Sequence, residues 1–489
     1  MQNKNSLIEV ISYYAETQPD KFCLADKKNH INYMEYFRYI IGFSRYLEKS
    51  GVKRGDRVVV KTIQMIPYLV SQMAIQLSGA VFVPLEKVIA ADRIQEIVSI
   101  TEAKLIIAEK EGDYGCPFVP FAAVYEHGWN GDIPYDSFRF PRGEDTAEIL
   151  FSTGTTGKSK GIELSNASVV AVAENVKYGV EMKPDNVEMI PVPLNHSHGL
   201  RRYYANMLNG SCVVVMDGVV FVNQIFEAMD KYHVTSMDLV PAMLAILLKL
   251  SKDRLGDYAD KLDYIEIGSA KIPEKDKESL CKLLPHTRLY DFYGSTEAGC
   301  SCILDFNKYK GKKDCIGKPT CNSIIKFVDD EGSEIRTSPQ KSGLIITGGT
   351  MLMKGYYKDE TLTADTLRGG YVYSSDEGYW GEDGLVYMLG RRGDIINIGG
   401  MKVDPAEIEE KVNQHPQIED CACVPMQDDI AGQAPKLFVV MKEGEEFLPI
   451  SIRNYLNDKL ESYKLPKIIE QMGKIPRTYN GKIIRKKLI

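Results

Sequence analysis

The chain has 489 residues, of which 44% are hydrophobic and 26% are charged, and its formal net charge is −7. This length exceeds what one hydrophobic core usually covers, so we expect at least two domains. The mild acidity argues against a nucleic-acid-binding protein, which needs a concentrated basic face. We find neither an apolar run near the roughly 18 residues of a membrane span nor an apolar signal core, so we expect a cytoplasmic protein without a transmembrane segment.

Short apolar runs alternate with amphipathic stretches along most of the chain. In chain order, the pattern predicts strands at 58–60, 79–84, 105–108, 148–151, 212–216, 236–240 and 264–267, and helices at 66–77 and 166–176. Strands that alternate with helices indicate an α/β protein whose parallel sheets are covered on both faces. Ligands of such folds bind at the carboxyl ends of the strands. The glycine-rich loops each follow a predicted strand, so we expect them to converge there.

The stretch 152–161 reads Ser-Thr-Gly-Thr-Thr-Gly-Lys-Ser-Lys-Gly and is the most informative part of the chain. Its glycines allow sharp turns that point successive N–H groups at one spot. Hydroxyl groups add neutral donors and two lysines add positive charge. The candidate phosphate-binding residues are Ser152, Thr153, Gly154, Thr155, Thr156, Gly157, Lys158 and Lys160. The glycine spacing is not that of a Walker P-loop, and the alternative interpretation is a flexible hairpin tip.

Three further segments carry side chains suited to a nucleotide. The run Asp291–Glu297, interpreted as one turn, holds an aromatic ring, a glycine, a hydroxyl and a carboxylate that could bind Mg²⁺. The small turn Gly268–Ala270 suits a flat ring lying close to the backbone. The carboxylate of Asp376 could accept hydrogen bonds from two ribose hydroxyls. A surface turn explains each of these segments about as well when it is taken alone.

Two clusters raise the question of a metal. Four of the ten cysteines lie between Cys300 and Cys321, but their spacing is not that of zinc ligand pairs, and we expect free thiols. His196 and His198 lie close together in the chain, but no third ligand is evident, so we discount a metal there as well. Arg201 and a second arginine follow, and either a pocket or a solvated helix face would explain them.

The character of the chain changes near residue 390. The segment 387–394 is polar and rich in turn-forming residues. Beyond it, Asp404 precedes a proline and an acidic residue, which is typical of a helix start. The pattern predicts strands at 419–424 and 436–441 and a helix at 450–463. We interpret this region as a small α+β domain on a hinge.

The order of these motifs resembles the acyl-adenylate-forming enzymes, which include acyl- and aryl-CoA synthetases, stand-alone adenylation enzymes and luciferase. The matching segments are the phosphate loop 152–161, Tyr293–Glu297, Asp376, Gly390–Arg391, Gly399–Val403 and the terminal signature Pro476–Ile483. Two positions depart from the family pattern. Ser159 stands where a proline is usual, and Gly393 stands where the family usually has an aspartate or lysine.

The resemblance implies an acetyl-CoA synthetase-like fold, with a large N-terminal domain of mixed and parallel sheets flanked by helices and a small mobile α+β C-terminal domain. It places the AMP-binding domain at 1–390, the hinge at 391–394 and the mobile domain at 395–489. It also implies that the mobile domain rotates between two half-reactions. Glycine at position 393 would absorb a large backbone change at little steric cost.

The resemblance assigns roles to individual residues. It identifies Lys482 as the catalytic lysine, His196 as the residue that flanks the acyl carboxylate, and Thr296 and Glu297 as partners of the phosphates. Magnesium would be held by Glu297 and Thr155. The implied nucleotide and CoA contacts are the phosphate-loop residues named above, together with Gly268, Ser269, Ala270, Phe292, Tyr293, Gly294, Asp376, Arg391, Gly399, Gly400 and Lys402.

The implied reaction is ATP-dependent activation of a small carboxylic acid as acyl-AMP, with release of pyrophosphate, followed by transfer to a thiol. ATP and Mg²⁺ are the implied cofactors, and CoA is the expected thiol co-substrate. Ser197 offers no carboxylate to an α-ammonium group, which favours an aryl or short-to-medium acyl acid over an amino acid. Two alternatives are an adenylation enzyme that loads a separate carrier protein and a non-catalytic nucleotide-binding protein of the same fold.

Overall fold

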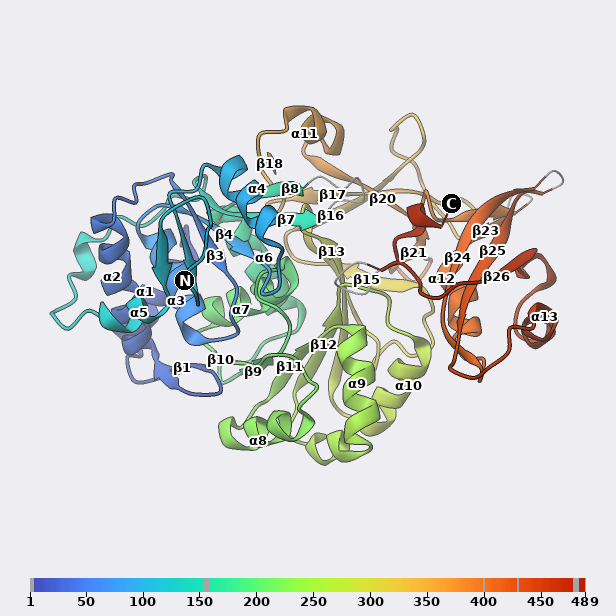
Figure 1. Cartoon of the computed structure of the whole chain (residues 1–489), viewed down its shortest axis with the longest axis horizontal. Helices are drawn as coiled ribbons and strands as arrows, with labels where there is room; N and C mark the ends of the chain where they lie inside the picture. Colours follow the sequence, from blue (N-terminus) through green and yellow to red (C-terminus); the bar gives the residue numbers. More distant parts are fainter. Residues whose placement is uncertain (1–3, 154–158, 399–400, 429–430, 478–482, 489) are drawn as a thin grey trace. The chain divides into compact units, whose positions relative to one another are not determined.

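The computed structural model describes residues 4–153, 159–398, 401–428, 431–477 and 483–488 (Figure 1). The chain divides into two compact units. The larger unit comprises Met1–Lys312, Ile316–Ile325 and Thr347–Val372, and the smaller unit comprises Lys313–Cys315, Lys326–Ile346 and Tyr373–Ile489. Within the described ranges, no helix combines the length and the apolar character that crossing a membrane requires.

One sheet of the larger unit has the strand order β18-β8-β7-β4-β3-β5-β6. Its strands are β3 (Arg57–Lys61), β4 (Val81–Leu85), β5 (Leu105–Ala108), β6 (Phe118–Pro120), β7 (Thr146–Thr153), β8 (Ser159–Ser165) and β18 (Gly355–Tyr356). Strands β3 to β7 are parallel, whereas β7 pairs antiparallel with β8, and β8 with β18. The predicted strands 58–60, 105–108 and 148–151 are confirmed, and 79–84 is confirmed with a later start.

The second sheet of this unit has the order β15-β14-β13-β12-β11-β9-β10-β1-β2. Its strands are β1 (Phe22–Ala25), β2 (His30–Asn32), β9 (Val187–Ile190), β10 (Cys212–Val215), β11 (Ser236–Leu239), β12 (Tyr264–Gly268), β13 (Arg288–Ser295), β14 (Gly299–Asp305) and β15 (Cys315–Pro319). The neighbours from β13 to β1 are parallel, and β2, β14 and β15 are antiparallel additions. The predicted strands at 212, 236 and 264 are therefore confirmed. The carboxyl ends of β11, β12 and β13 share one edge of this sheet, which is where ligands bind in parallel sheets.

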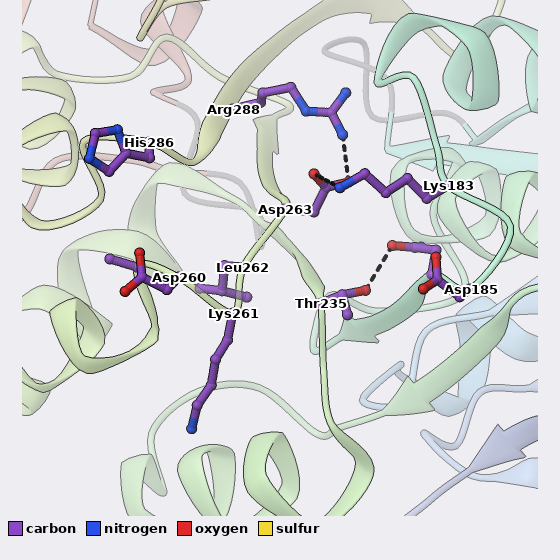
Figure 2. Close-up of a pocket in the computed structure, with 11 residues that line it drawn as sticks. Lys183, Asp185, Thr235, Asp260, Lys261, Leu262, Asp263, His286 and Arg288 are labelled. Carbon is purple, nitrogen blue, oxygen red and sulfur yellow. Dashed lines mark hydrogen bonds and ion pairs between the residues drawn. The ribbon is translucent and has the colours of Figure 1, made fainter.

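A cavity of about 420 Å³ lies at the opposite edge, at the amino ends of β9, β11, β12 and β13. Figure 2 shows the charged groups that line it. Asp263 accepts ion pairs from Lys183 at 2.8 Å and from Arg288 at 2.5 Å. These ion pairs neutralise the centre of the cavity, and it lies away from the edge of the sheet where ligands bind.

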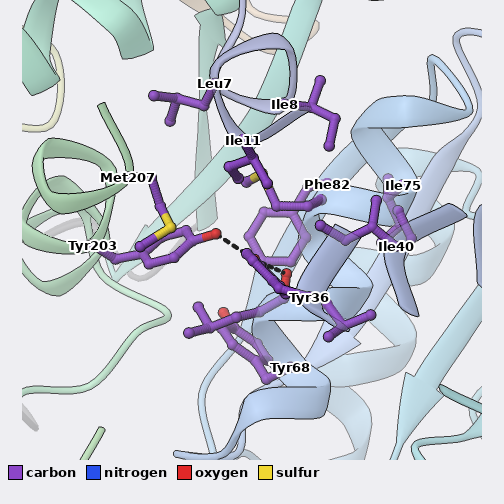
Figure 3. Packing of buried hydrophobic residues seen from close by; sticks show 14 of the residues in the cluster. Leu7, Ile8, Ile11, Tyr36, Ile40, Tyr68, Ile75, Phe82, Tyr203 and Met207 are labelled. Carbon is purple, nitrogen blue, oxygen red and sulfur yellow. Dashed lines mark hydrogen bonds between the residues drawn. The ribbon is translucent and has the colours of Figure 1, made fainter. Parts of the chain in front are cut away.

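The helices of the larger unit are α1 (Leu7–Thr17), α2 (Tyr33–Lys49), α3 (Ile66–Leu77), α4 (Ala91–Thr101), α5 (Ala122–Glu126), α6 (Asn166–Gly179), α7 (Ser197–Asn209), α8 (Val222–Tyr232), α9 (Pro241–Ser251), α10 (Glu274–Leu283) and α11 (Glu360–Thr366). Helices α1, α2, α3, α5, α6 and α7 contribute to one hydrophobic core of the larger unit (Figure 3). The hydroxyl groups of Tyr36 on α2 and Tyr203 on α7 lie 2.5 Å apart, and the Tyr36 hydroxyl also lies 3.1 Å from the Leu69 carbonyl. These buried hydroxyls are thus hydrogen-bonded, which fixes α7 against the N-terminal helices.

The smaller unit contains a sheet of order β23-β22-β25-β24, with β26 beside β25. Its elements are β22 (Ile396–Ile398), β23 (Met401–Val403), α12 (Pro405–Val412), β24 (Ile418–Asp428), β25 (Gly432–Met441), α13 (Pro449–Asn457) and β26 (Ile468–Gln471). Asp404 caps α12 by accepting from the Ala406 N–H at 2.9 Å, as predicted. The predicted helix 450–463 is too long, because α13 ends where Asn457 and Asp458, both weak helix formers, follow each other.

The strands around the predicted hinge lie mainly in this unit. They are β16 (Ser323–Val328), β17 (Gly343–Gly349), β20 (Tyr371–Trp380) and β21 (Val386–Arg391). Strands β16, β17 and β20 each have a few residues in the larger unit. A short β19 (Leu367–Arg368) pairs with β20. Although the segment 387–394 is rich in turn-forming residues, its first five residues lie in β21, which pairs with β20.

Candidate active site

The glycine-rich motif joins two antiparallel strands. Strands β7 and β8 pair up to Thr153 and Ser159, and the predicted phosphate contacts Gly154, Thr155, Thr156, Gly157 and Lys158 lie outside the described residues. Of the predicted residues that remain, Ser152 and Thr153 end β7, and Lys160 lies on β8. The ammonium of Lys160 lies 5.9 Å from the centre of the Tyr356 ring, within cation–π range.

The segment Asp291–Glu297 is a strand followed by a turn, not the single turn predicted from sequence. Strand β13 continues through Ser295 and pairs with β14, with a bulge between Tyr293 and Gly294. A Cβ on Gly294 would lie 2.0 Å from the Gly299 carbonyl oxygen, so only glycine allows the hairpin to close. The Phe292 side chain is buried in a core cluster, where it contributes packing.

Two hydrogen bonds connect the turn after β13 to distant parts of the chain. The Thr296 hydroxyl lies 3.0 Å from the Ser197 hydroxyl at the start of α7. The Tyr356 hydroxyl donates to the Glu297 carboxylate at 2.9 Å. Burial and the nearby Glu297 charge raise the pKa of Tyr356 well above its usual value. Tyr356 could not be predicted from the sequence, because it lies 59 residues after Glu297 and no local pattern indicates this contact.

Helix α7 begins at the predicted acyl-binding motif. His196 is its N-cap, and the Asn195 side-chain nitrogen lies 3.2 Å from His196 Nε2. Arg201 donates to the Ser295 carbonyl and, at 3.6 Å, to the Cys300 sulfur. Arg202 is buried and pairs with Glu188 at 2.6 Å. Both arginines therefore bind groups within the protein, with Arg202 buried and Arg201 half-buried.

A small cavity lies against the first two turns of α7. It is lined by Glu148, Leu164, Val169, Val172, Ser197, Arg201, Tyr204 and Thr296. The Tyr204 hydroxyl donates to Glu148, and burial raises the pKa of that carboxyl to about 7. The cavity thus adjoins both Thr296 and the start of α7, two of the segments named by the sequence analysis.

The predicted adenine-binding turn follows β12. Gly268 ends the strand, and Ser269 has a φ of 72°, a left-handed conformation that is uncommon for residues other than glycine. Ser269 and Ala270 are exposed, as a ligand-facing turn requires. A Cβ on Gly268 would lie 2.7 Å from His198 Cε1 and 2.8 Å from a Glu266 oxygen. Side chains of α7 and β12 therefore meet directly beside this turn.

His198 has two acidic neighbours that our sequence analysis did not find. Its Nε2 lies 2.8 Å from an Asp238 oxygen and 3.6 Å from a Glu266 oxygen. The three groups could hold a metal ion by their spacing. Burial raises the pKa of Asp238 to about 7 and that of Glu266 well above its usual value, and it lowers that of His198. Asp238 and Glu266 lie on β11 and β12, far from His198 in sequence.

The cysteine cluster shows hydrogen bonds typical of free thiols. Cys300, Cys302 and Cys315 are buried, and Cys321 is exposed, with no disulfide recorded for them. The Cys321 sulfur lies 3.3 Å from the Asn175 side-chain oxygen. Within the described part of the chain, the side chains whose ligand atoms lie close enough together to hold a metal ion are His198, Asp238 and Glu266.

The smaller unit holds the predicted ribose contacts. Asp376 on β20 pairs in register with Arg391 on β21, and the Arg391 Nε lies 3.4 Å from an Asp376 oxygen. The Ser374 hydroxyl donates to the Ile345 carbonyl at 2.7 Å and accepts from the Asp376 N–H at 3.0 Å. The Arg391 side chain is 61% exposed, so its guanidinium is accessible to a ligand as well as to Asp376.

The predicted hinge is a turn closed by Arg391. Its carbonyl accepts from the N–H groups of Asp394 and Ile395, each at 2.8 Å. Gly393 does not have a positive φ, whereas Gly390 does, at 134°. A Cβ on Gly393 would meet nothing within 4 Å. Position 393 therefore needs no glycine in this conformation.

The remaining predicted residues are described only in part. Gly399, Gly400 and Lys482 lie outside the described residues. Lys402 lies on β23, where it pairs with Asn397 of β22. Their assigned roles stay predictions.

Comparison with known proteins extends over nearly the whole chain. The family model described as AMP-binding enzyme matches residues 11–357, and that described as AMP-binding enzyme C-terminal domain matches residues 407–482. The 2-succinylbenzoate–CoA ligase of Bacillus cereus (strain AH820) is 27% identical over 477 residues, which cover 96% of this chain and 95% of that protein. The probable CoA ligase CCL5 of Humulus lupulus is 25% identical over 492 residues, covering 94% of this chain and 88% of that protein.

Solved structures share the fold at lower sequence identity. The o-succinylbenzoate CoA synthetase (MenE) from Bacillus subtilis, in complex with its acyl-adenylate intermediate OSB-AMP, has a TM-score of 0.86 and 20% identity, covering 98% of this chain and 97% of that one. ATP-bound MatB from Rhodopseudomonas palustris has a TM-score of 0.84 and 21% identity, covering 98% of both chains. The predicted fold class is thus confirmed. The family models together establish that the chain belongs to the family of AMP-binding enzymes.

Proposed function

We propose that this AMP-binding enzyme is an acid–thiol ligase that uses ATP and Mg²⁺ to activate a small carboxylic acid and transfers the acyl group to CoA. The acid's carboxylate attacks the α-phosphorus of ATP, and pyrophosphate leaves. The CoA thiol then attacks the acyl carbonyl, and AMP leaves. The curated relatives named above as CoA ligases support this assignment, which agrees with the predicted reaction. We also propose a cytoplasmic location, where ATP and CoA are available.

The observation that carries the proposal is the meeting of three motifs around Thr296 and Glu297. Thr296 contacts Ser197 at the start of the acyl-binding motif, and Glu297 contacts Tyr356, whose ring lies below Lys160 of the phosphate hairpin. These motifs are far apart in sequence. An enzyme that joins a carboxylate to a phosphate needs its acid, metal and phosphate contacts at one place.

The residues of this site fit a magnesium ion. Glu297 offers carboxylate oxygens, which Mg²⁺ prefers as ligands, and its Oε1 is already oriented by the Tyr356 hydroxyl. Glu297 and Thr155 would hold the ion. When bound, Mg²⁺ neutralises the phosphate charge that otherwise repels the attacking carboxylate.

The other roles follow the family pattern. His196 flanks the acyl carboxylate, and the turn after β12 and Tyr293 enclose the adenine. Asp376 and Arg391 bind the ribose, with Asp376 accepting from its hydroxyls. Lys482 would bridge the carboxylate and the α-phosphate, where positive charge stabilises the developing negative charge.

We further propose that the chain works as a large domain (1–390), a hinge (391–394) and a mobile domain (395–489). Rotation at the hinge would withdraw Lys482 after adenylation and bring the Gly399–Gly400 loop toward the pantetheine of CoA. The short turn closed by the Arg391 carbonyl supports this assignment, since a turn of this length can change its backbone angles by breaking a few local contacts.

A two-stage assay tests the proposal. The full-length protein is incubated with ATP, Mg²⁺ and each acid of a panel of aryl and short-to-medium acyl acids, and pyrophosphate release is measured. CoA is then added, and acyl-CoA is measured by mass spectrometry. We expect acid-dependent pyrophosphate and a CoA thioester. Pyrophosphate without a thioester, but with loading of a separate carrier protein, would contradict the acceptor. ATP binding without any acid-dependent turnover would contradict catalysis.

A further inference from the structure

A buried acidic pocket lies at the carboxyl ends of β11 and β12. It is formed by Asp238, Glu266 and His198, whose ligand atoms lie within 4.8 Å of one another. The Asp238 and Glu266 side chains are 0% and 1% exposed, and that of His198 is 16% exposed. Two carboxyl groups this close and this deeply buried are rare unless something positive or hydrogen-bonding joins them.

Apart from the hydrogen bond that the two carboxyl groups share with each other, three carboxylate oxygens of the acidic pocket have no hydrogen-bond partner among the described residues. They are both oxygens of Glu266 and Oδ2 of Asp238. The other Asp238 oxygen, Oδ1, lies 2.8 Å from His198 Nε2. Buried acceptors without donors are costly, so these three oxygens indicate donors that arrive with a ligand.

The nearby buried cation does not satisfy the acidic pocket. The Arg202 guanidinium binds Glu188 at 2.6 Å, and its NH2 nitrogen contacts the Tyr264 hydroxyl at 3.1 Å. Glu188, Asp238 and Glu266 are all buried beside this one arginine. The local charge is therefore negative unless the pocket binds a proton or another cation.

The acidic pocket adjoins the proposed acyl-binding site. Gly268 lies so close that a Cβ there would touch both His198 and Glu266, so the acidic pocket lies directly against the turn after β12. On the other side, Ser197 precedes His198 and contacts Thr296. A ligand whose carboxylate lies near His196 and Thr296 would extend its other end toward these acids.

We propose that the acid activated by this enzyme carries a protonated amine away from its carboxylate, and that Asp238 and Glu266 bind this amine. The inference rests on the proposed function and concerns the same site. An ammonium group has three N–H donors, which match the three unpartnered oxygens. A divalent metal fits less well, because His198 Nε2, the atom that would bind it, already contacts Asp238 directly. Ser197 offers no carboxylate, but Asp238 on β11 and Glu266 on β12 do, which revises our expectation that an acid with an amino group is disfavoured.

The test uses pairs of acids that differ only in CH₂NH₃⁺ against CH₂CH₃. Suitable pairs are 4-(aminomethyl)benzoate with 4-ethylbenzoate, 3-(aminomethyl)benzoate with 3-ethylbenzoate, and 4-aminobutyrate with pentanoate. Acid-dependent pyrophosphate release gives kcat/KM for each member. We expect the amine-bearing member of the best pair to be favoured on the order of 100-fold, because a site built for a polar group rejects the apolar isostere strongly.

Variants locate the preference in the acidic pocket. Glu266→Gln and Asp238→Asn, each made separately, should reduce the preference for the amine-bearing acid to within a few-fold. Each should lower kcat/KM for the amine-bearing acids and leave kcat/KM for the acids without an amine unchanged. Asp263→Asn is the matched control, because it removes a carboxylate from the opposite end of the same sheet. Its preference should equal that of the unmodified protein.

Several results would overturn the inference while leaving the proposed function intact. Neutral acids that are activated as well as, or better than, their amine-bearing partners would do so. The inference would also be overturned if the Glu266→Gln and Asp238→Asn variants kept the preference for the amine. In that case the two carboxyl groups share a proton with each other and do not bind the substrate. Elemental analysis that finds a stoichiometric divalent metal, lost in Glu266→Gln, would assign the pocket to a metal instead. Failure of every acid to release pyrophosphate would overturn the proposed function and the inference with it.

Discussion

The hydrogen bond from Tyr356 to Glu297 provides the sharpest prediction about the candidate active site. Tyr356→Phe removes one hydroxyl and keeps the ring that lies 5.9 Å from the Lys160 ammonium. The lost bond joins a hydroxyl to a carboxylate at 2.9 Å, and such bonds contribute about 1.5–3 kcal/mol. Because Glu297 is only half-buried, we take the lower end of this range, which corresponds to roughly a tenfold effect.

The effect should appear in the magnesium dependence of adenylation. We expect Tyr356→Phe to need about tenfold more Mg²⁺ for half-maximal pyrophosphate release, because Glu297 loses the group that orients it. Tyr357→Phe is the control, since it deletes the neighbouring hydroxyl, and it should behave like the unmodified protein. The melting temperature of each variant shows whether the fold is intact. A Tyr356→Phe enzyme with unchanged Mg²⁺ dependence would refute the role of this contact.

Three further predictions concern the lysine, the hinge and a buried acid. Lys482→Ala should lose acid-dependent pyrophosphate exchange by orders of magnitude but still convert a supplied acyl-adenylate to the CoA thioester. Equal loss of both half-reactions would indicate a role of Lys482 in folding. Gly393→Pro fixes φ at about −65° and should leave one half-reaction intact and block the other. If both half-reactions proceed normally, the domain rotates about a residue other than Gly393. Burial raises the pKa of Glu148 from 4.5 to about 7, so between pH 4.5 and pH 7 this carboxyl group ionises only in the unfolded state. The free energy of unfolding of the wild-type protein therefore falls as the pH rises through this range. Glu148→Gln should therefore gain roughly 3 kcal/mol relative to wild type between pH 4.5 and pH 8 in urea unfolding, and a pH-independent difference would contradict the assignment.

The regular elements could be predicted from sequence because local patterns determine them. Apolar runs such as 105–108 became buried parallel strands with the predicted bounds, and the Asp404 cap was read from its neighbours alone. Local composition is a weaker guide where tertiary pairing overrides it. The segment 387–391 contains turn-forming residues but is held in β21 by its pairing with β20. In the same way, Gly294 suggested a turn but serves the close approach of β14.

The candidate site could be predicted only where its residues belong to ordered motifs. The phosphate loop and Tyr293–Glu297 carry their chemistry in consecutive residues. Tyr356 and the acidic pocket do not, because the partners of Glu297 and His198 come from strands distant in sequence. Asp238 and Glu266 each lie in an apolar strand pattern, where a lone acid gives no sign of the other. Only the parallel pairing of β11 and β12 brings them together.

The central claim is that the chain forms an acyl-adenylate, and oxygen transfer tests it most directly. The best acid from the panel is labelled with ¹⁸O in its carboxylate and converted to the thioester with ATP and CoA, and the nucleotide is analysed by mass spectrometry. Attack of the carboxylate on the α-phosphorus predicts that one labelled oxygen appears in AMP. Formation of ADP with the label in inorganic phosphate, or AMP without label, would contradict the account.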